Sequence, residues 1–271
     1  MKIATWNINS ARARADRILE VLERHNLDVL ALQEIKCKPE QFPSAEILAA
    51  GYEIAAHGIN QWNGVALISR VGLTEIKTEF PGQPGFQKGE PEPGALFIDN
   101  GIPEPRAIGA DCGGVEIWSL YVPNGRAVND PHYHYKLEFL NRLNQFAQEK
   151  LASDAAAKFA FLADWNVIPT DDDVWDPNAM DEGLYLTQPE RDAFHAFAES
   201  GLIELSRQFA DNYTYWDYQQ LRFPKNQGMR IDYLYASPAL AKLAIAGEID
   251  RDERKGKGAS DHVPVIIEFN N

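Results

Sequence analysis

The chain has 271 residues, of which 45% are hydrophobic and 24% are charged. This composition is typical of a globular protein with a sizeable core, and it excludes disordered and collagen-like chains. Lysine and arginine number 26 against 40 aspartates and glutamates, a formal net charge of −14. No general basic field therefore attracts nucleic acid or an anionic membrane, and a polyanionic partner would have to be held by local positive charge.

The two cysteines, Cys37 and Cys112, are too few for a disulfide framework and lack the CxxC spacing of a zinc or redox site. The first apolar run reaches polar residues by position 7, which is too short for a signal peptide. No stretch approaches the roughly 20 apolar residues that span a bilayer. We therefore predict a cytoplasmic protein without membrane contact.

Short apolar runs rich in β-branched residues recur along the chain and predict strands. They are Ile3–Ile8, Val29–Leu32, Tyr52–Ala56, Val65–Ser69, Ile117–Val122, Phe159–Ala163, Ile231–Ala236 and Val263–Phe269. Apolar residues at helical spacing predict helices over Arg14–His25, Tyr133–Leu151 and Pro189–Ser200. Because strands and helices mix over the whole length without a linker or repeat, we predict one α/β domain over residues 1–271.

Three segments have a less regular character. Repeated prolines and glycines between Phe80 and Pro105 predict a loop, or a loose edge hairpin around Ala95–Ile98. The acidic triplet Asp171–Asp173 is interpreted as solvated surface. His132 and His134 are interpreted as part of an exposed loop near Pro131, in preference to a metal site.

Polar residues with oxygen atoms repeatedly end or open the predicted strands, where a rigid sheet can aim them into one cleft. They are Asn7, Glu34, Asp164, Asn166, Asp232 and the adjacent Asp261 and His262. Carboxylate and amide oxygens are the ligands that Mg²⁺ prefers, and the scarcity of cysteine argues against zinc. Each residue alone is more often a turn former or a helix cap, so none is diagnostic by itself.

Eight segments spread over nearly the whole chain form an ordered set: TWNINSARAR, LALQEIKC, NGVAL, SLYVPNG, LADWNVIPTDDDV, YTYWDY, GMRIDYLYAS and SDHVPV. In this order and spacing they resemble the exonuclease III family of DNA-repair nucleases, also called AP endonuclease family 1. The resemblance implies the deoxyribonuclease I-like fold, a four-layer α/β sandwich of two packed β-sheets flanked by helices. It also implies a monomeric, Mg²⁺-dependent hydrolase, with Mn²⁺ as a substitute, acting on duplex DNA at abasic sites, nicks or blocked 3′ ends.

The same resemblance assigns roles to single positions. It implies metal ligands at Asn7, Glu34, Asp164, Asn166, Asp261 and His262, with Glu34 the principal one. It implies catalytic roles for Tyr121, Asp164, Asn166, Asp232 and His262. In these roles Asp164 deprotonates the attacking water, Asn166 positions that water, and Asp232 holds His262 cationic against the phosphate. Substrate contacts are implied for Asn124, Arg106, Tyr215, Met229, Arg230 and Ile231.

Three of the implied substrate contacts, Tyr215, Met229 and Ile231, would wall a pocket for a base-free sugar flipped from the duplex. Simple core packing explains these three apolar residues equally well. The arginine and lysine residues of the loop Arg222–Arg230 lie between two of the matching segments. Phosphate contacts from such a loop would position a duplex without reading its sequence, and would be sensitive to salt.

The chain departs from the family pattern at several places. Asn9 stands where many relatives carry aspartate, which removes one charge from the metal site, and Ala163 replaces the usual glycine before the catalytic aspartate. The proline- and glycine-rich segment before Arg106 is longer than usual. Tyr185, in the loop Asp176–Glu190, is bulky where abasic-site specialists carry a small residue. If its ring fills the pocket, we expect 3′-end trimming to be favoured over internal incision.

Two other classes of function remain open from the sequence. A superfamily phosphatase acting on small phosphoesters, such as inositol headgroups, would share the acidic set, but the segments YVPNG, YTYWDY and GMRIDYLYAS favour the nuclease branch. A non-catalytic DNA-binding module would not need the acidic set, which is intact here.

Overall fold

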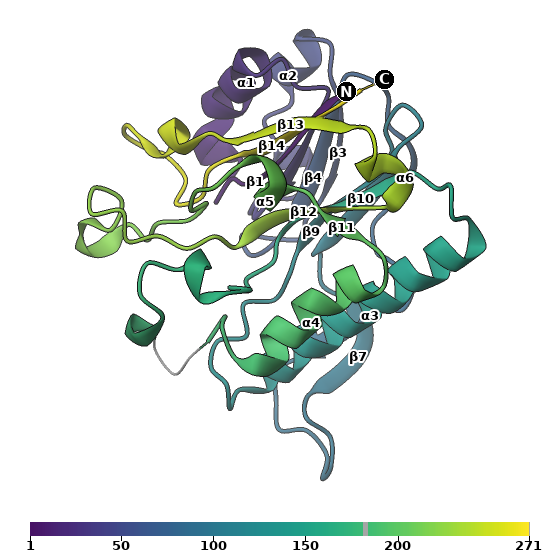
Figure 1. Cartoon of the computed structure of the whole chain (residues 1–271), viewed down its shortest axis with the longest axis vertical. Helices are drawn as coiled ribbons and strands as arrows, with labels where there is room; N and C mark the ends of the chain where they lie inside the picture. The colour runs from purple at the N-terminus through teal and green to yellow at the C-terminus, as the bar shows by residue number, and fades with distance from the viewer. Residues whose placement is uncertain (181–183, 271) are drawn as a thin grey trace.

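Two six-stranded mixed β-sheets form the centre of the computed structural model, which describes residues 1–180 and 184–270 (Figure 1). The first sheet has the order β13-β14-β1-β2-β4-β3, with strands Ala244–Ile249, Val265–Phe269, Lys2–Asn7, Val29–Gln33, Val65–Ser69 and Glu53–His57. The second has the order β11-β12-β10-β9-β8-β5, with strands Ile203–Glu204, Asp232–Ala236, Phe159–Asp164, Glu116–Tyr121, Ala107–Asp111 and Thr74–Lys77. A separate hairpin pairs β6 (Gly85–Gln87) with β7 (Ile98–Pro103).

The two sheets pack face to face because their central strands are apolar on both sides. In β2 every residue is buried, and successive side chains point to opposite faces. Val29 and Ala31 join the core between the sheets, where they meet Leu162 of β10. Leu30 and Leu32 belong to the core on the outer face of the first sheet. A continuous apolar run thus serves two cores at once.

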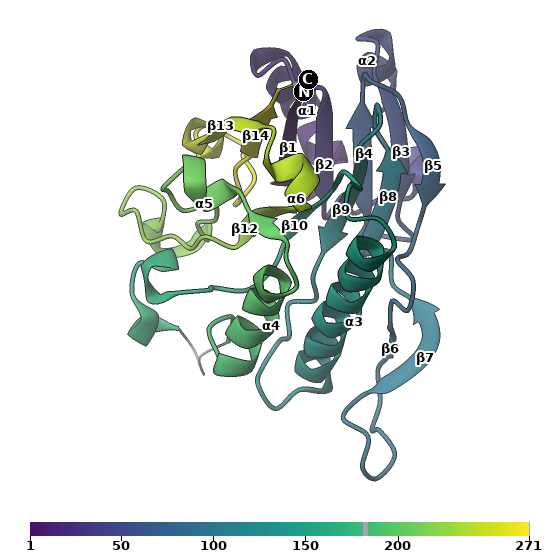
Figure 2. The ribbon, with the colours of Figure 1, turned by 45° about the vertical axis from the view of Figure 1, so that its right-hand side comes forward.

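Helices cover the two outer faces. α1 (Ala15–Arg24) buries Ile18, Val21 and Leu22 against the first sheet, and α2 (Ala45–Ala49) adds to the same layer. α3 (Pro131–Ser153) and α4 (Gln188–Glu199) lie side by side over the second sheet (Figure 2). Two short helices, α5 (Ser206–Phe209) and α6 (Pro238–Ala241), connect strands. The predicted four-layer sandwich is confirmed. Among the described helices, none is both long and apolar enough to cross a bilayer.

The elements that the sequence does not predict are mostly edge strands. β5 is exposed along its whole length and β13 alternates without a strong apolar side, so neither carries a clear strand pattern. β8 contains Gly109, which lies under the ring of Trp118. The hairpin in the proline- and glycine-rich segment is real, but its strands are β6 and β7, so the expected centre at Ala95–Ile98 is wrong. It projects from one end of the molecule (Figure 2).

Two predictions of exposed polar residues need correction: Asp171 and Asp172 are exposed as expected, but Asp173 and His132 are not. Asp173 is buried, where it accepts hydrogen bonds from Arg207 and from the hydroxyl of Thr170 (2.7 Å). His132 lies in the first turn of α3, not in an exposed loop. Its backbone N–H donates to Asp130 at 2.7 Å and its buried ring accepts from the N–H of Gly125 at 3.3 Å. Both residues are buried because they make hydrogen bonds inside the fold, and the charge pattern of the sequence does not reveal such bonds.

The burial of His132 makes stability depend on pH. Burial, followed by the nearby charges of Arg106 and Arg126, lowers the pKa of His132 to about 4, against a smaller opposing effect of Glu104 and Asp130. Because the unfolded chain binds this proton at higher pH than the folded one, the stability due to neutral His132 is lost as the pH falls from about 6.5 toward 4.

We expect the free energy of unfolding of the wild type to fall by about 2 kcal/mol more than that of His132→Phe between about pH 7.5 and pH 5. The phenyl ring keeps the contacts of the imidazole with Phe86 and Tyr135 but does not titrate. Urea unfolding at several pH values measures the difference, and every other titrating group is common to both proteins. Parallel pH profiles would show that His132 is not buried in its neutral form.

Candidate active site

The predicted site residues meet at one edge of the sandwich because four parallel strand ends lie there. In the first sheet β1 and β2 run parallel, and Asn7, at the end of β1, pairs with the last residue of β2. In the second sheet β9 and β10 run parallel, with Tyr121 opposite Asp164. The antiparallel β12 begins at Asp232, also opposite Asp164. Residues far apart in sequence are thereby placed at one end of both sheets.

The side chain of Asn7 joins the two sheets. Its Nδ2 donates to Glu34 Oε1 and to Asp164 Oδ2, both at 2.9 Å. Its Oδ1 accepts from the backbone N–H of Asn9 at 3.0 Å, which fixes the orientation of the amide. Glu34 follows β2 and Asp164 ends β10, so one buried amide holds two carboxylates from opposite sheets.

An oxygen-rich group surrounds Glu34. Lys36 Nζ lies 2.7 Å from Glu34 Oε2 and donates to Asn9 Oδ1 at 2.6 Å. Asn9 Nδ2 in turn donates to Asp261 Oδ1 at 2.9 Å. Burial raises the pKa of Glu34, but the charge of Lys36 and the hydrogen bonds from Asn7 and Lys36 outweigh it and hold the pKa below its usual value. The ionised Glu34 and the neighbouring Asp261 suit a hard cation.

His262 is held between two carboxylates of the second sheet. Its Nδ1 lies 2.9 Å from Asp232 Oδ2 and its Nε2 lies 3.8 Å from Asp164 Oδ2. Burial lowers the pKa of His262, but the charges of Asp232 and Asp164 outweigh this effect and raise it to about 10. His262 is therefore an imidazolium at neutral pH, with Nδ1–H donated to Asp232 and Nε2–H available to another acceptor.

Ligand atoms of Asp164, Asp232 and His262 lie within 4.8 Å of one another, which makes this trio a second grouping with the composition of a metal site. A cationic imidazole carries a proton on both nitrogens and has no lone pair for a metal. The charge state of His262 therefore favours the Glu34 side of the site for a divalent cation.

Asp164 lies at the centre of these contacts. Burial raises its pKa to about 7; the charge of His262 opposes this shift and that of Asp232 adds to it. Its Oδ1 accepts from the backbone N–H of Asn166 at 3.0 Å. Asn166 adopts a left-handed conformation with φ of 49°, and its Nδ2 donates to the carbonyl of Val122 at 2.9 Å. The amide of Asn166 thus fixes the turn after Asp164.

Tyr121 faces the same group from β9. Burial raises the pKa of its hydroxyl well above the usual value, and the Glu34 carboxylate adds to this shift, so the hydroxyl stays a hydrogen-bond donor. Arg106 lies behind Tyr121, with its guanidinium carbon 4.9 Å from the ring centroid and Nε 2.7 Å from Glu104 Oε2. Arg106 is buried, so the predicted DNA contact is replaced by a role behind Tyr121.

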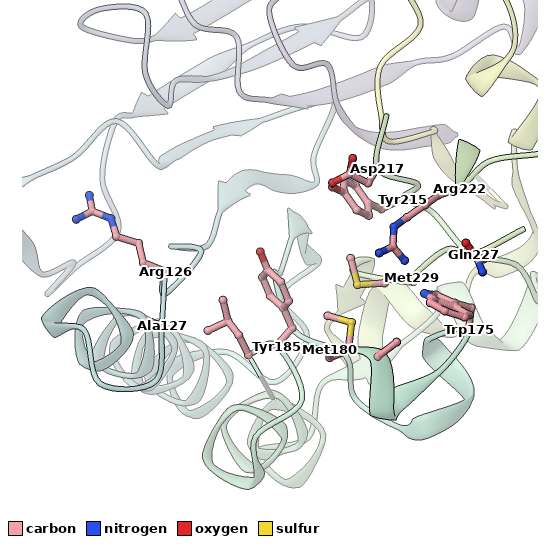
Figure 3. A pocket seen from close by; sticks show the side chains of 12 residues that line it. Arg126, Ala127, Trp175, Met180, Tyr185, Tyr215, Asp217, Arg222, Gln227 and Met229 are labelled. Carbon is pink, nitrogen blue, oxygen red and sulfur yellow. The ribbon is translucent and has the colours of Figure 1, made fainter. Parts of the chain in front are cut away.

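A cavity of about 630 Å³ adjoins the charged residues (Figure 3). Its lining comes from five segments: Arg126, Ala127, Trp175, Ala179, Met180, Leu184, Tyr185, Tyr215, Asp217, Arg222, Gln227 and Met229. The ring of Tyr215 lies 4.8 Å from that of His262, so the cavity opens beside the imidazolium. The hydroxyl of Tyr185 accepts a hydrogen bond from Asn124 Nδ2, and its side chain stands between Arg126 and Met229 (Figure 3).

Tyr215 and Met229 therefore line this cavity, whereas two other residues predicted to contact substrate do not. Ile231 is buried in a small core with Ile168 and Val174. Arg230 is also buried, and it donates to the carbonyls of Asn212 (2.8 Å) and Ala210 beside a different cavity. Arg230 points away from its two neighbours because successive residues of an extended segment point to opposite faces. Ile231 lies in the small core against which Met229 and Tyr215 pack.

Several residues of the site were missed by sequence reasoning. Lys36 follows Glu34 by two positions, and no sequence pattern predicts its contact with that carboxylate. Arg222, in the loop expected to contact phosphate, packs over the Trp175 ring with its guanidinium carbon 5.5 Å from the ring centroid. Arg126, which no motif marked, stands on the opposite side of the cavity. Their neighbourhood depends on loops whose paths no local pattern predicts.

Known proteins resemble this chain both in sequence and in fold. The model of the Endonuclease/Exonuclease/phosphatase family matches residues 4–262. The chain belongs to this family. It is 28% identical to exodeoxyribonuclease III of Haemophilus influenzae, covering 99% of this chain and 100% of the relative. Its fold matches an AP endonuclease of Archaeoglobus fulgidus with a TM-score of 0.87 and 28% identity, over 100% of both chains.

A third similar structure is the 3′ phosphatase NExo from Neisseria, bound to a product DNA hairpin. It has a TM-score of 0.88 and 30% identity, and the match covers 100% of this chain and 99% of the other. These relatives confirm the predicted family and fold. They also support the prediction of an exonuclease III-type DNA-repair hydrolase.

Proposed function

We propose that this protein uses a divalent cation to hydrolyse phosphate esters of duplex DNA, at 3′ ends and at abasic sites. The observation that carries the proposal is the Asn7 bridge, which places Glu34 and Asp164 on one amide while His262 approaches Asp164 at 3.8 Å. A general base, a carboxylate suited to a cation and a donor for a phosphate thereby lie close together. The names of the similar proteins agree with this chemistry.

Each residue of the site has a separate role in the proposed reaction. Asp164, with a pKa near 7, accepts a proton from the attacking water, because a base is most efficient when its pKa lies near the working pH. The Nε2–H of His262 and the hydroxyl of Tyr121 donate to the oxygens on which negative charge develops. A Mg²⁺ ion at Glu34 would supply Lewis-acid stabilisation of that charge.

Hydrolysis of a duplex carrying a 3′-phosphate or an internal abasic site tests the proposal directly. We expect turnover with Mg²⁺ and none with EDTA. Asp164→Asn should lower kcat roughly 10³-fold or more, because the amide cannot accept the proton. The control is Glu116→Gln, in which a carboxylate paired with Lys150 far from the site is lost; it should turn over like the wild type. Hydrolysis of inositol phosphates but not of DNA would replace the nuclease by the small-phosphoester phosphatase.

We further propose that the cation binds on the Glu34 side, with Asn7 and Asp261 close by, and not at the trio of Asp164, Asp232 and His262. The support is chemical: Glu34 is ionised and oxygen-rich surroundings suit Mg²⁺, whereas His262 is protonated.

Calorimetric titration of the DNA-free protein with Mn²⁺ distinguishes the two groupings. Glu34→Gln should weaken binding at least roughly tenfold because it removes the principal charged ligand, whereas Asp232→Asn should change the affinity only a few-fold. The opposite ranking of the two variants would move the cation to the histidine side.

We also propose that Tyr185 directs the enzyme toward 3′ ends. Its ring lies within the cavity, its hydroxyl is bonded to Asn124, and the pocket is therefore partly filled where a flipped sugar would enter. Of the loop 176–190, residues 181–183 lie outside the described residues. Tyr185 has a φ of 74°, a conformation that glycine adopts without strain.

Replacing the ring tests this proposal without forcing the backbone. Tyr185→Gly should raise incision at an internal abasic site roughly tenfold or more relative to removal of a 3′-phosphate, since it opens the cavity at no conformational cost. Tyr185→Phe keeps the ring and should show no such gain. An unchanged ratio of the two activities in the glycine variant would contradict a gating role.

A further inference from the structure

The most completely buried cation of the described residues lies one layer behind the active site, and the reaction described above does not use it. Lys136 projects from α3 with none of its surface exposed. Its Nζ donates to the backbone carbonyl of Asn166 at 2.6 Å and to a carboxylate oxygen of Glu190, which is equally buried. Burying a lysine costs free energy unless its ammonium group is paired and hydrogen-bonded.

The first task concerns the turn that carries the catalytic base. The backbone N–H of Asn166 donates to Asp164, and the backbone carbonyl of the same residue accepts from Lys136. Asn166 is left-handed, so this peptide stays in place only if its surroundings fix it. Lys136 therefore fixes the carbonyl of Asn166, and the N–H of the same residue fixes Asp164.

The second task concerns the pocket. The ammonium nitrogen of Lys136 lies 5.1 Å from the ring centroid of Tyr185, within cation–π range. The other oxygen of Glu190 accepts from the N–H and hydroxyl of Thr187, at 3.1 and 2.8 Å, and so caps α4 two residues after Tyr185. The carbonyl of Tyr185 accepts from the N–H of Ile168 at 2.7 Å. The same ammonium therefore touches the catalytic turn and the pocket segment.

We propose that Lys136 is a positioning residue that sets the Asp164–Asn166 turn and the Tyr185 ring together, through one ammonium group that neither meets solvent nor touches substrate. This inference rests on the proposed hydrolysis of DNA 3′ ends for its kinetic consequence. Its structural consequence is independent of any activity.

A comparison of two variants isolates the ammonium from simple stability. Lys136→Met alone would leave Glu190 as an unpaired buried charge, which destabilises any protein. Glu190→Gln keeps the ammonium on the Asn166 carbonyl, and the double variant K136M/E190Q differs from it only by losing that ammonium. The glutamine can still accept from Thr187 in both proteins.

On a duplex with a 3′-phosphate, we expect kcat of K136M/E190Q to be roughly 10- to 100-fold below that of Glu190→Gln, with KM changed much less, because a small displacement of Asp164 affects the chemical step and not the binding of DNA. Lys150→Met is the matched control: it removes another ion-paired lysine of α3, and its kcat should equal that of the wild type. Equal kcat values for E190Q and K136M/E190Q would overturn the proposal.

Hydrogen exchange on the same proteins decides the structural part whatever the turnover. Faster amide exchange in K136M/E190Q than in Glu190→Gln, concentrated in residues 164–168 and 185–187, supports the positioning role. Equal exchange in these segments would overturn it. If the wild type hydrolyses no DNA but the exchange differs as expected, the proposed function fails while the positioning role stands.

Discussion

A concentration of buried charge is the constraint on which the rest of the site depends. Asp164, Asp232 and His262 are all buried, and a single buried charge left without a partner costs about 3–5 kcal/mol. The imidazolium lies between the two aspartates, while the Asn7 amide donates to Asp164 and Glu34 at once. The charges are therefore compensated by groups from other segments of the chain. The site can exist only where both sheets end together, and the sandwich is the scaffold that brings them there.

The backbone leaves its regular path at the residues that matter most. Glu34, Lys36, Asn166 and Tyr185 are all left-handed, with φ between 49° and 74°. Glu34 directly follows the end of β2 and Asn166 lies two residues after the end of β10, where a regular extended backbone would continue the ladder. A left-handed residue turns the chain at once and aims its side chain along the edge. The conformation costs on the order of 1 kcal/mol for a residue with a side chain, and the dense hydrogen bonding around Asn166 offsets that cost.

The sequence predicts the parts of this structure that have a local signature. β2, β4 and β10 are continuous apolar runs, and Asn7, Glu34 and Asp164 stand at strand ends within recognisable segments, so their convergence could be anticipated. β5 and β13 could not, since an edge strand takes its pairing from its neighbour and needs no apolar pattern of its own. The family resemblance places Arg106 and Arg230 at the DNA, but a match of motifs does not show whether an arginine side chain reaches solvent. Their burial follows from carbonyl and carboxylate partners that only the folded chain brings near, and the same holds for Lys136.

These buried cations also bear on how an acidic protein handles DNA. Arg106, Lys136 and Arg230 are paired with internal carboxylates or carbonyls, so their charges are not available for counterion release on a duplex. The cations left at the mouth of the cavity, Arg126 and Arg222, flank the pocket from opposite sides. With a net charge of −14, the protein has no general basic field to attract DNA, so local cations have to supply the phosphate contacts. Local contacts of this kind hold a duplex less tightly along its length than a continuous basic surface would, which agrees with the proposed action at 3′ ends.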